Sequence, residues 1–294
     1  MKKLTIFAMT EKGHAVVSSI FAAHPGIIDA VVSARDQNAA NDGFADIERF
    51  CRENGITFRE RSDAPAFGTE YAIAVSWRWM LDGGPARLIV FHDSLLPRYR
   101  GFNPLVTALI NGDTEIGVTA LFAAEGYDRG EIIAQSISTI AYPITIQDAI
   151  TTILVNYREL AVSVADKLAR GEAIVGTPQS EAMASYSLWR DERDYFIDWT
   201  KPATTLRRTI DAMGYPYRGA ATTIDGKVAR VLEAEALPDV TIANRTCGKV
   251  IFVHGTKPVV VCGEGLLRID ELVDDTGRSL LPLARFRTRF DGAA

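Results

Sequence analysis

Short apolar runs alternate with amphipathic stretches through the first half of the chain. The runs are typical of buried strands, because they are short, rich in aliphatic residues and bounded by polar or glycine positions. They are Leu4–Met9, Ile27–Val32, Tyr71–Val75, Leu88–Phe91, Ile116–Phe122 and Ile132–Ile140. Between them, the residues after Thr10 and the stretch 43–54 have apolar positions at helical spacing. Strands that alternate with helices predict an open, doubly wound, mostly parallel α/β sheet.

The pattern changes past the middle of the chain. A long stretch with helical spacing, Ile146–Arg170, ends before Gly171, and Thr145 is a typical N-cap for it. The segment at about 185–200 is polar and aromatic without a regular period, so we interpret it as a connector. A short helix is then predicted over Pro202–Met213, with proline in its first turn.

The last third of the chain has the pattern of a small β domain. Short apolar stretches are separated by turns, at Ala220–Thr223, Val228–Leu232, Val250–Val253, Val259–Val261 and Leu266–Leu272. Asp225-Gly226 between the first two is a strong hairpin signal. Short strands at this spacing predict a small β-barrel-like, OB-like domain. We therefore expect a first domain at 1–188, a connector at 189–201 and a C-terminal domain at 202–294.

Composition and charge narrow the class of protein. At 294 residues the chain is long enough for about two domains. Hydrophobic residues make up 47% and charged residues 23%, which excludes disordered, collagen-like and coiled-coil classes. The net charge of −5 argues against a broad basic surface for nucleic acid. Three widely spaced cysteines and the absence of a long apolar run indicate a cytoplasmic protein without disulfides, signal peptide or membrane span.

A histidine stands at the end of one predicted strand, where chemistry is expected. His92 closes the run Leu88–Phe91 and opens a loop that carries Arg98, Tyr99 and Arg100. Open α/β sheets bind their ligands beyond the carboxyl ends of the strands. Imidazole groups titrate near neutral pH and serve as general bases, so His92 is a candidate base. On position alone, a structural histidine bonded to a backbone carbonyl is equally compatible.

A second polar motif follows the strand predicted at Ile116–Phe122. The sequence Glu125-Gly-Tyr-Asp-Arg-Gly places Asp128 between two glycines, which permit a tight loop. Such a loop can hold a carboxylate close to a neighbouring imidazole and orient the ring. Alone, the motif is weak, because an aspartate between glycines is commonly a turn residue.

Together the two motifs resemble the formyltransferase family that uses 10-formyltetrahydrofolate. The matching residues are His92, Ser94 to Pro97, Tyr99 to Gly101, Pro104, Ala108 to Gly112, Gly117 to Thr119, Asp128 and Gly130, with a weaker likeness at Pro178-Gln179, Ile197 to Trp199 and Tyr215 to Ala220. Members formylate glycinamide ribonucleotide, methionyl-tRNA or nucleotide-linked amino sugars. The resemblance implies a Rossmann-like catalytic domain, a small β-rich domain, and metal-free transfer of a formyl group to an amine.

The resemblance also assigns catalytic roles. His92 matches the family's histidine and Asp128 its distant aspartate. The family asparagine two residues before the histidine is replaced by Val90, which cannot donate a hydrogen bond to the oxyanion that forms during transfer. Losing such a donor costs about 3–4 kcal/mol of transition-state stabilisation. Asn103 and Ser94 are the nearest polar candidates for a substitute donor, and a protonated His92 acting alone is the alternative.

The expected donor site lies beside the strand predicted at Tyr71–Val75. By the resemblance, the loop after this strand and the loop before Asp128 wrap the pterin ring of the folate, largely through backbone groups. The residues expected to bind this cosubstrate are Trp77, Arg78, Trp79, Met80, Val90 and Tyr127. The tryptophans could supply flat apolar walls or could simply pack in the core.

The acceptor is expected to contact Arg98, Tyr99 and Arg100, because arginines bind phosphate and pyrophosphate; for Arg100, bracing the loop is the alternative. A tRNA acceptor would favour a basic face, whereas this chain is acidic overall. We therefore expect a small amine as substrate, first of all a nucleotide-linked amino sugar, with a homodimer left open. The alternatives are a methionyl-tRNA formyltransferase, another acyl donor, and a binding or regulatory protein that lost catalysis at Val90.

Overall fold

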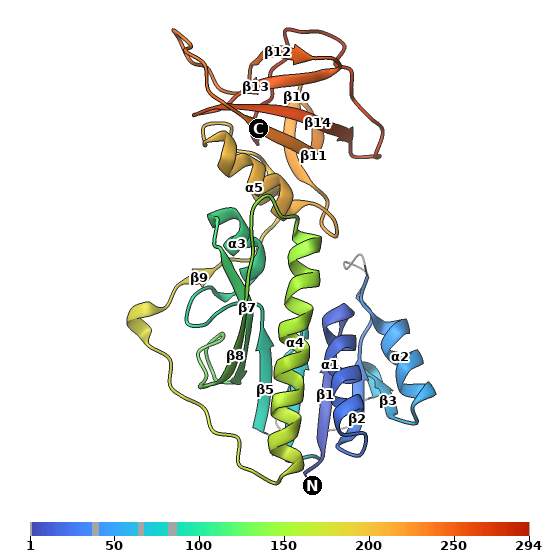
Figure 1. Cartoon of the computed structure of the whole chain (residues 1–294). Helices are drawn as coiled ribbons and strands as arrows, with labels where there is room; N and C mark the ends of the chain where they lie inside the picture. The colour runs from blue at the N-terminus through green and yellow to red at the C-terminus, as the bar shows by residue number, and fades with distance from the viewer. Residues whose placement is uncertain (1, 37–40, 64–67, 82–86, 294) are drawn as a thin grey trace. The chain divides into compact units, whose positions relative to one another are not determined.

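Two units make up the computed structural model, which describes residues 2–36, 41–63, 68–81 and 87–293 (Figure 1). The first unit consists of residues 1–104, 115–139 and 150–187. The second consists of residues 105–114, 140–149 and 188–294. The domain boundaries expected from the sequence stay a prediction.

A seven-stranded sheet organises the described residues of the first unit, in the order β3-β2-β1-β4-β5-β7-β8. The strands are β1 (Leu4–Ala8), β2 (Ile28–Ser33), β3 (Thr57–Glu60), β4 (Tyr71–Val75), β5 (Arg87–His92), β7 (Glu115–Phe122) and β8 (Ile132–Thr139). The first five are parallel, whereas β7 is antiparallel to β5 and β8 is antiparallel to β7. The expected mostly parallel α/β sheet is confirmed.

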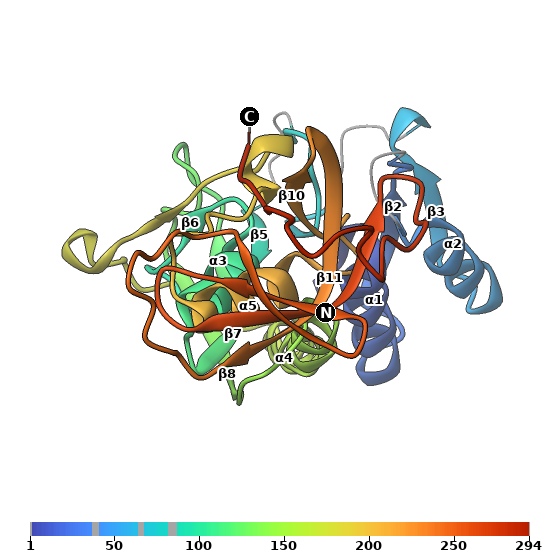
Figure 2. The same cartoon turned by 90° about the horizontal axis from the view of Figure 1, so that it is seen from above.

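Helices α1 (Thr10–Ala23) and α4 (Ile146–Ala169) lie side by side on one face of this sheet (Figures 1 and 2). Helix α2 (Phe44–Glu53) connects β2 to β3, and the short strands β6 (Arg100–Gly101) and β9 (Tyr186–Ser187) pair in parallel.

The two faces of β5 are distinguished by ring contacts. Phe91 packs against Tyr157 of α4, with 5.9 Å between ring centroids. Side chains alternate along a strand, so Leu88, Val90 and His92 point to the opposite face. There Leu88 and Val90 join an apolar cluster with residues of β1, β2 and β4. The candidate site therefore lies on the face that α4 does not cover.

The second unit is rich in antiparallel strands. They pair in the order β10-β11-β14-β13-β12, with β10 at Ala220–Ile224, β11 at Lys227–Leu237, β12 at Val250–His254, β13 at Lys257–Val261 and β14 at Leu266–Asp274. The C-terminal segment forms bridges at both ends of this order, from Asp291 to Thr223 and from Arg289 to Lys249. Helices α3 (Pro104–Asn111), from Leu105 on, and α5 (Ala203–Met213) belong to this unit. The expected small β-rich domain is confirmed.

All three cysteines are free thiols, and burial raises the pKa of Cys51 and Cys262 to about 12. In the part of the chain that the structure describes, no helix is both long and apolar enough to cross a membrane. The same residues contain no cluster of histidine, cysteine and carboxylate side chains that could hold a metal ion. The cytoplasmic location stays a prediction.

Candidate active site

Several residues in the loops near the end of β5 have a strained backbone conformation. Positive φ angles of 47–61° occur at Thr10, Ser76, Tyr99, Asn103 and Asp128. A side chain other than glycine in this conformation costs about 1–3 kcal/mol, and such strain persists where the surroundings enforce it. Its concentration in these loops marks them as a candidate functional site.

His92, the last residue of β5, is hydrogen-bonded through one ring nitrogen and faces a carboxylate with the other. Its Nε2 lies 2.8 Å from the Tyr99 carbonyl oxygen, and since a carbonyl only accepts, Nε2 carries a proton and donates it. Its Nδ1 faces Asp128 Oδ2 at 3.5 Å. In the neutral imidazole both of these facing atoms are acceptors. The gap between them is therefore suited to a proton or to an N–H group from a third molecule.

Asp128 lies in the loop between β7 and β8. The Gly101 amide donates to Asp128 Oδ2 at 2.8 Å. Gln179 Nε2 donates to the backbone oxygens of Asp128 and Gly130, at 2.7 and 2.8 Å. A Cβ at Gly130 would lie 1.7 Å from the Phe122 carbonyl oxygen, so only glycine allows the loop to return this closely. The carboxylate is thus held in place before any ligand arrives.

An apolar surface, here called the shelf, adjoins His92 on the same face of the sheet. It consists of the partly buried side chains Leu88, Val90 and Trp77. The Trp77 ring meets the rings of Phe7 and Trp79 edge to face, both at 5.2 Å. Trp77 Nε1 is buried and has no hydrogen-bond partner among the described residues. The structure thus brings Trp77 and Val90 together, and their role at a donor site stays a prediction.

The other residues expected at the donor site are spread around the shelf. Arg78 forms an ion pair with Asp36. Trp79 lies beneath the Arg61 guanidinium, 4.7 Å from the ring centroid. Met80 is 86% exposed. Tyr127 lies apart from them, next to Asp128, and its ring contacts Phe102.

The two candidate arginines differ sharply in exposure. Arg98 is exposed, and its Nη2 donates to the Tyr99 hydroxyl at 3.1 Å. Arg100 is fully buried. Its guanidinium donates to Gln179 and pairs with Glu181, each at 3.0 Å. This geometry favours the bracing role for Arg100 and leaves Arg98 as the arginine that a phosphate can reach.

The two candidate oxyanion donors also differ. Ser94 is buried, and its hydroxyl donates to the Arg98 carbonyl oxygen at 2.7 Å. The same loop is braced by Thr119, which donates to the Ser94 carbonyl oxygen at 2.6 Å and accepts from the Leu96 amide at 3.1 Å. Asn103 is partly exposed and follows Gly101 by two residues. Both stay predictions, with the Ser94 proton already used within the loop.

Sequence reasoning missed a buried cluster directly behind His92. Asp93 forms an ion pair with Lys12 and accepts a hydrogen bond from the Tyr157 hydroxyl. Burial alone would raise the pKa of Asp93, but the Lys12 ammonium and the two hydrogen bonds hold it below its usual range. Burial and the neighbouring carboxylate raise the pKa of Tyr157 well above its usual value. The only sequence signal was a charged residue next to a strand-end histidine.

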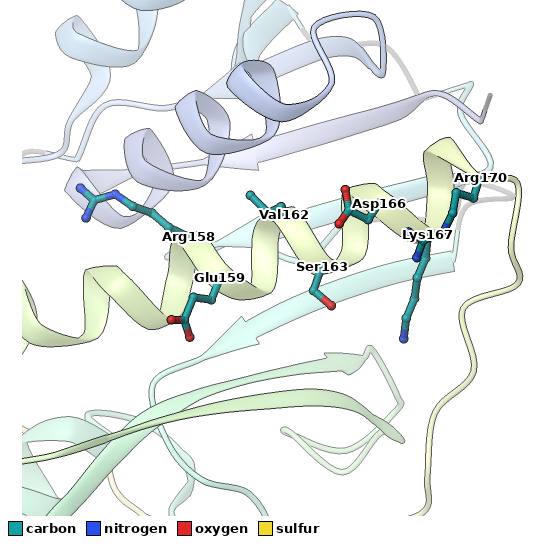
Figure 3. A pocket seen from close by; sticks show the side chains of 7 residues that line it. All are labelled: Arg158, Glu159, Val162, Ser163, Asp166, Lys167 and Arg170. Carbon is teal, nitrogen blue, oxygen red and sulfur yellow. The ribbon is translucent and has the colours of Figure 1, made fainter.

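A hollow of about 550 Å³ lies elsewhere, along α4 (Figure 3). Its lining side chains project from that one helix and carry both signs of charge: Arg158, Glu159, Val162, Ser163, Asp166, Lys167 and Arg170. None of the residues around His92 contributes to it. The hollow is therefore separate from the candidate active site.

Comparisons with known proteins agree on one family. The formyl transferase model matches residues 66–164, and the model of the formyl transferase C-terminal domain matches residues 191–287. The chain is 32% identical over 256 residues to the methionyl-tRNA formyltransferase of Burkholderia thailandensis, covering 80% of this chain and 77% of that protein. It is 30% identical over 222 residues to that of Heliobacterium modesticaldum, covering 71% and 68%.

Solved structures share the fold at low sequence identity. The Helicobacter canadensis N-formyltransferase, crystallised with folinic acid and dTDP-3-aminofucose, has a TM-score of 0.70 at 16% identity, over 92% of this chain and 99% of that chain. The methionyl-tRNA formyltransferase of Clostridium thermocellum has a TM-score of 0.56 at 14% identity, over 80% and 93%. The family expected from the sequence motifs is confirmed: the chain belongs to the formyl transferase family of enzymes.

Proposed function

We propose that this protein transfers a formyl group from 10-formyltetrahydrofolate to the amine of a small substrate, first of all a nucleotide-linked amino sugar. The observation that carries the proposal is the placement of His92 Nδ1 opposite Asp128 Oδ2, 3.5 Å apart, beside the shelf. These two facing acceptor atoms can share one proton. An amine that attacks a formyl carbon must release one proton, so the pair matches the chemistry of the reaction.

His92 moves this proton in the proposed mechanism. As the amine nitrogen bonds to the formyl carbon, Nδ1 receives the amine proton, and the resulting imidazolium faces the Asp128 carboxylate. The bond between the formyl carbon and the folate nitrogen then breaks, and His92 returns the proton to that nitrogen. Because the Tyr99 carbonyl oxygen holds Nε2 in place, the ring keeps its orientation throughout. Asp128 acts by stabilising the imidazolium, as a carboxylate does beside a catalytic histidine.

The shelf is the proposed seat of the folate ring. Flat, partly exposed apolar surfaces suit planar heterocycles, with a few polar groups to fix orientation. Leu88, Val90 and Trp77 offer such a surface next to His92. Two structures with the same fold support a folate donor: the Helicobacter canadensis enzyme contains folinic acid, and a HypX structure from Aquifex aeolicus contains tetrahydrofolic acid.

The preference for a sugar acceptor rests on charge and on fold. The net charge of −5 is unfavourable for tRNA, whose binding depends on many phosphate contacts. Exposed Arg98 is the proposed contact for the phosphates of a nucleotide. The likeness to the Helicobacter canadensis enzyme extends over 99% of that chain, and the structure of that enzyme contains a nucleotide sugar.

A methionyl-tRNA acceptor is the second candidate. It is favoured by the curated relatives, since those at 32% and 30% identity are methionyl-tRNA formyltransferases. The two candidates can be distinguished by which acceptor, an amino sugar or methionyl-tRNA, supports formyl transfer.

Tetrahydrofolate release tests the proposal. The full chain is mixed with 10-formyltetrahydrofolate and, in parallel, with dTDP-3-aminofucose, other nucleotide-linked amino sugars, or methionyl-tRNA. We expect release with a sugar and none with tRNA, and release at least about 100-fold slower from a His92→Asn variant. Release with tRNA alone would establish the second candidate, and no release with any acceptor would overturn both.

A further inference from the structure

A single glutamine side chain holds the backbone of the loop that carries Asp128. Gln179 Nε2 donates to the carbonyl oxygens of Asp128 and Gly130, at 2.7 and 2.8 Å. Asp128 has a φ of 52°, which is a strained conformation for a residue other than glycine. Such strain persists where the surroundings enforce it. The Gln179 amide is therefore one of the groups that keep Asp128 in the conformation in which its carboxylate faces His92.

The orientation of the Gln179 amide is set by Arg100. The fully buried guanidinium of Arg100 donates through Nε to Gln179 Oε1 at 3.0 Å. A guanidinium only donates and a backbone carbonyl only accepts, so the amide satisfies its partners in one orientation, with its oxygen toward Arg100 and its nitrogen toward the loop. Arg100 directly precedes Gly101, whose amide donates to Asp128 Oδ2 at 2.8 Å. Gln179 thus connects both sides of the hydrogen bond that orients the carboxylate.

The backbone that carries Gln179 is fixed to the sheet. Thr177 and Ile132 exchange two backbone hydrogen bonds, each 2.8 Å long. Ile132 begins β8, directly after the loop between β7 and β8. This antiparallel bridge places Gln179, two residues after Thr177, opposite Gly130, two residues before Ile132. A side chain held by the sheet at its backbone and by a buried arginine at its amide can determine where the loop lies.

We propose that Gln179 is a positioning residue for formyl transfer, because its two N–H donors keep the Asp128 carboxylate opposite His92. This inference rests on the proposed function, in which Asp128 stabilises the imidazolium that forms when the amine attacks. Gln179 acts through Asp128 and takes no part in the proton transfer itself. A displacement of about 1 Å at a reacting group can lower a rate by about 100-fold, so a residue that only positions Asp128 can have a large effect on kcat.

The Gln179→Glu variant separates the two contacts of the amide. A carboxylate keeps the length of the side chain and an acceptor for Arg100, but it replaces the N–H donors by an oxygen that repels the two carbonyl oxygens of the loop. We expect kcat to fall about 30-fold, with the KM for 10-formyltetrahydrofolate and for the acceptor within about threefold of wild type. Gln147→Glu is the matched control, because it makes the same change in the first turn of α4, where a carboxylate is favourable. Its kcat should equal that of the wild type.

A double-mutant cycle distinguishes the positioning of Asp128 from a general loosening of the site. In an Asp128→Asn background there is no carboxylate left to position, so adding Gln179→Glu should lower kcat by less than about threefold further. Rates are normalised to the folded fraction, and Gln179→Met takes the place of Gln179→Glu if glutamate prevents folding. Wild-type kcat in the single variant would mean that Gln179 only braces Arg100, and an equal loss in both backgrounds would mean that it acts independently of Asp128. Either result would overturn the proposal.

The NMR signals of the His92 ring test the positioning without relying on turnover. The chain has four histidines, and the spectrum of His92→Asn identifies the signals of this one. In Gln179→Glu these signals should shift in the same direction as in Asp128→Asn, whereas in Gln147→Glu they should match the wild type. Unchanged His92 signals in Gln179→Glu would overturn the proposal even if the wild type transfers formyl groups. If the signals shift but the wild type formylates no acceptor, the positioning of Asp128 by Gln179 stands and the proposed function fails.

Discussion

His92 and Asp93 are adjacent in the chain, and they point to opposite faces of the sheet. Asp93 is enclosed on the side of α1 and α4, where Lys12 and Tyr157 occupy both of its oxygens. His92 faces the other side, where one ring nitrogen is bonded to a carbonyl and the other confronts a second acceptor. Both oxygens of the Asp93 carboxylate have partners within the protein, whereas His92 Nδ1 faces another acceptor and can interact with a donor on a ligand.

The contrast separates stability from function along a single strand. A buried carboxylate whose charge is matched by an ammonium and a hydroxyl fixes the end of β5 between two helices. The His92 imidazole and the Asp128 carboxylate, by contrast, face each other at a distance at which they can hold a proton. Substitutions on the Asp93 side should therefore change folding, and substitutions on the His92 side should change turnover.

The largest effect is expected from Asp128→Asn. An amide at this position can still accept the Gly101 hydrogen bond, so the loop should stay in place. It cannot stabilise an imidazolium, and turnover should fall by about 1,000-fold. Tetrahydrofolate release and thermal melting measure the two properties. A large fall in the melting temperature would mean that Asp128 is structural, and the contrast with Asp93 would break.

Asp93→Asn should have the reverse profile. Removing the charge takes away the carboxylate that pairs with the Lys12 ammonium in a largely buried position, which costs about 3 kcal/mol of unfolding free energy. Turnover per folded molecule should stay within about threefold. Denaturant unfolding gives the first number and active-site-normalised rates give the second. A selective loss of turnover in a stable variant would place Asp93 in the catalytic machinery.

Lowering the pH should reduce the stability that the charged Asp93 contributes to the folded protein. The pKa of Asp93 in the folded protein lies below its ordinary value of 3.8, so the folded state binds this proton more weakly than the unfolded chain does. The stabilisation is then fully present above about pH 4 and is lost as the pH falls through the folded pKa. The difference in unfolding free energy between wild type and Asp93→Asn should shrink below pH 4. A difference that is constant down to pH 2 would contradict this origin.

A smaller effect, in the favourable direction, is expected from Val90→Asn. Val90 and His92 share a face of β5, so an amide at 90 would point toward the reacting carbon. It would supply a hydrogen-bond donor for the oxyanion. Ser94 cannot readily act as this donor, because its hydroxyl already donates to the Arg98 carbonyl oxygen. We expect turnover to rise about tenfold. Unchanged or lower turnover would mean that another group, such as Asn103, already serves, and Asn103→Ala would then be the damaging change.

Most strands and helices could be predicted from the hydrophobic pattern, because burial determines where apolar runs occur, but β3 (Thr57–Glu60) and α3 (Pro104–Asn111) were not among them. The direction of strands could not. The runs at β7 and β8 look like the parallel ones, yet β7 is antiparallel to β5 and β8 is antiparallel to β7. The connection from β7 to β8 is too short for a crossover helix, whereas the connection from β5 to β7 contains β6 and α3 and still returns the chain antiparallel. Register and direction depend on those connections, which an apolar run does not encode.

The candidate site could be predicted only in part. His92 and Asp128 were found by motif, and the structure brings them within 3.5 Å. The partners of Asp93 lie 81 and 64 positions away in the chain, and no local pattern links them. For Arg100 the sequence leaves a substrate contact and a brace for its loop both open, and only the buried contacts of its guanidinium with Gln179 and Glu181 favour the brace. Long-range pairing of polar groups is decided by packing, which sequence patterns do not specify.

The rate of formyl transfer by His92→Asn is the most direct test of the division between the two faces of β5. The wild type and the variant are compared at saturating 10-formyltetrahydrofolate with the amino sugar that the wild type accepts, and their melting temperatures are measured in the same buffer. We expect turnover to fall by at least about 100-fold while the melting temperature changes by no more than a few degrees. Turnover equal to that of the wild type would remove His92 from the chemistry and place the active site elsewhere.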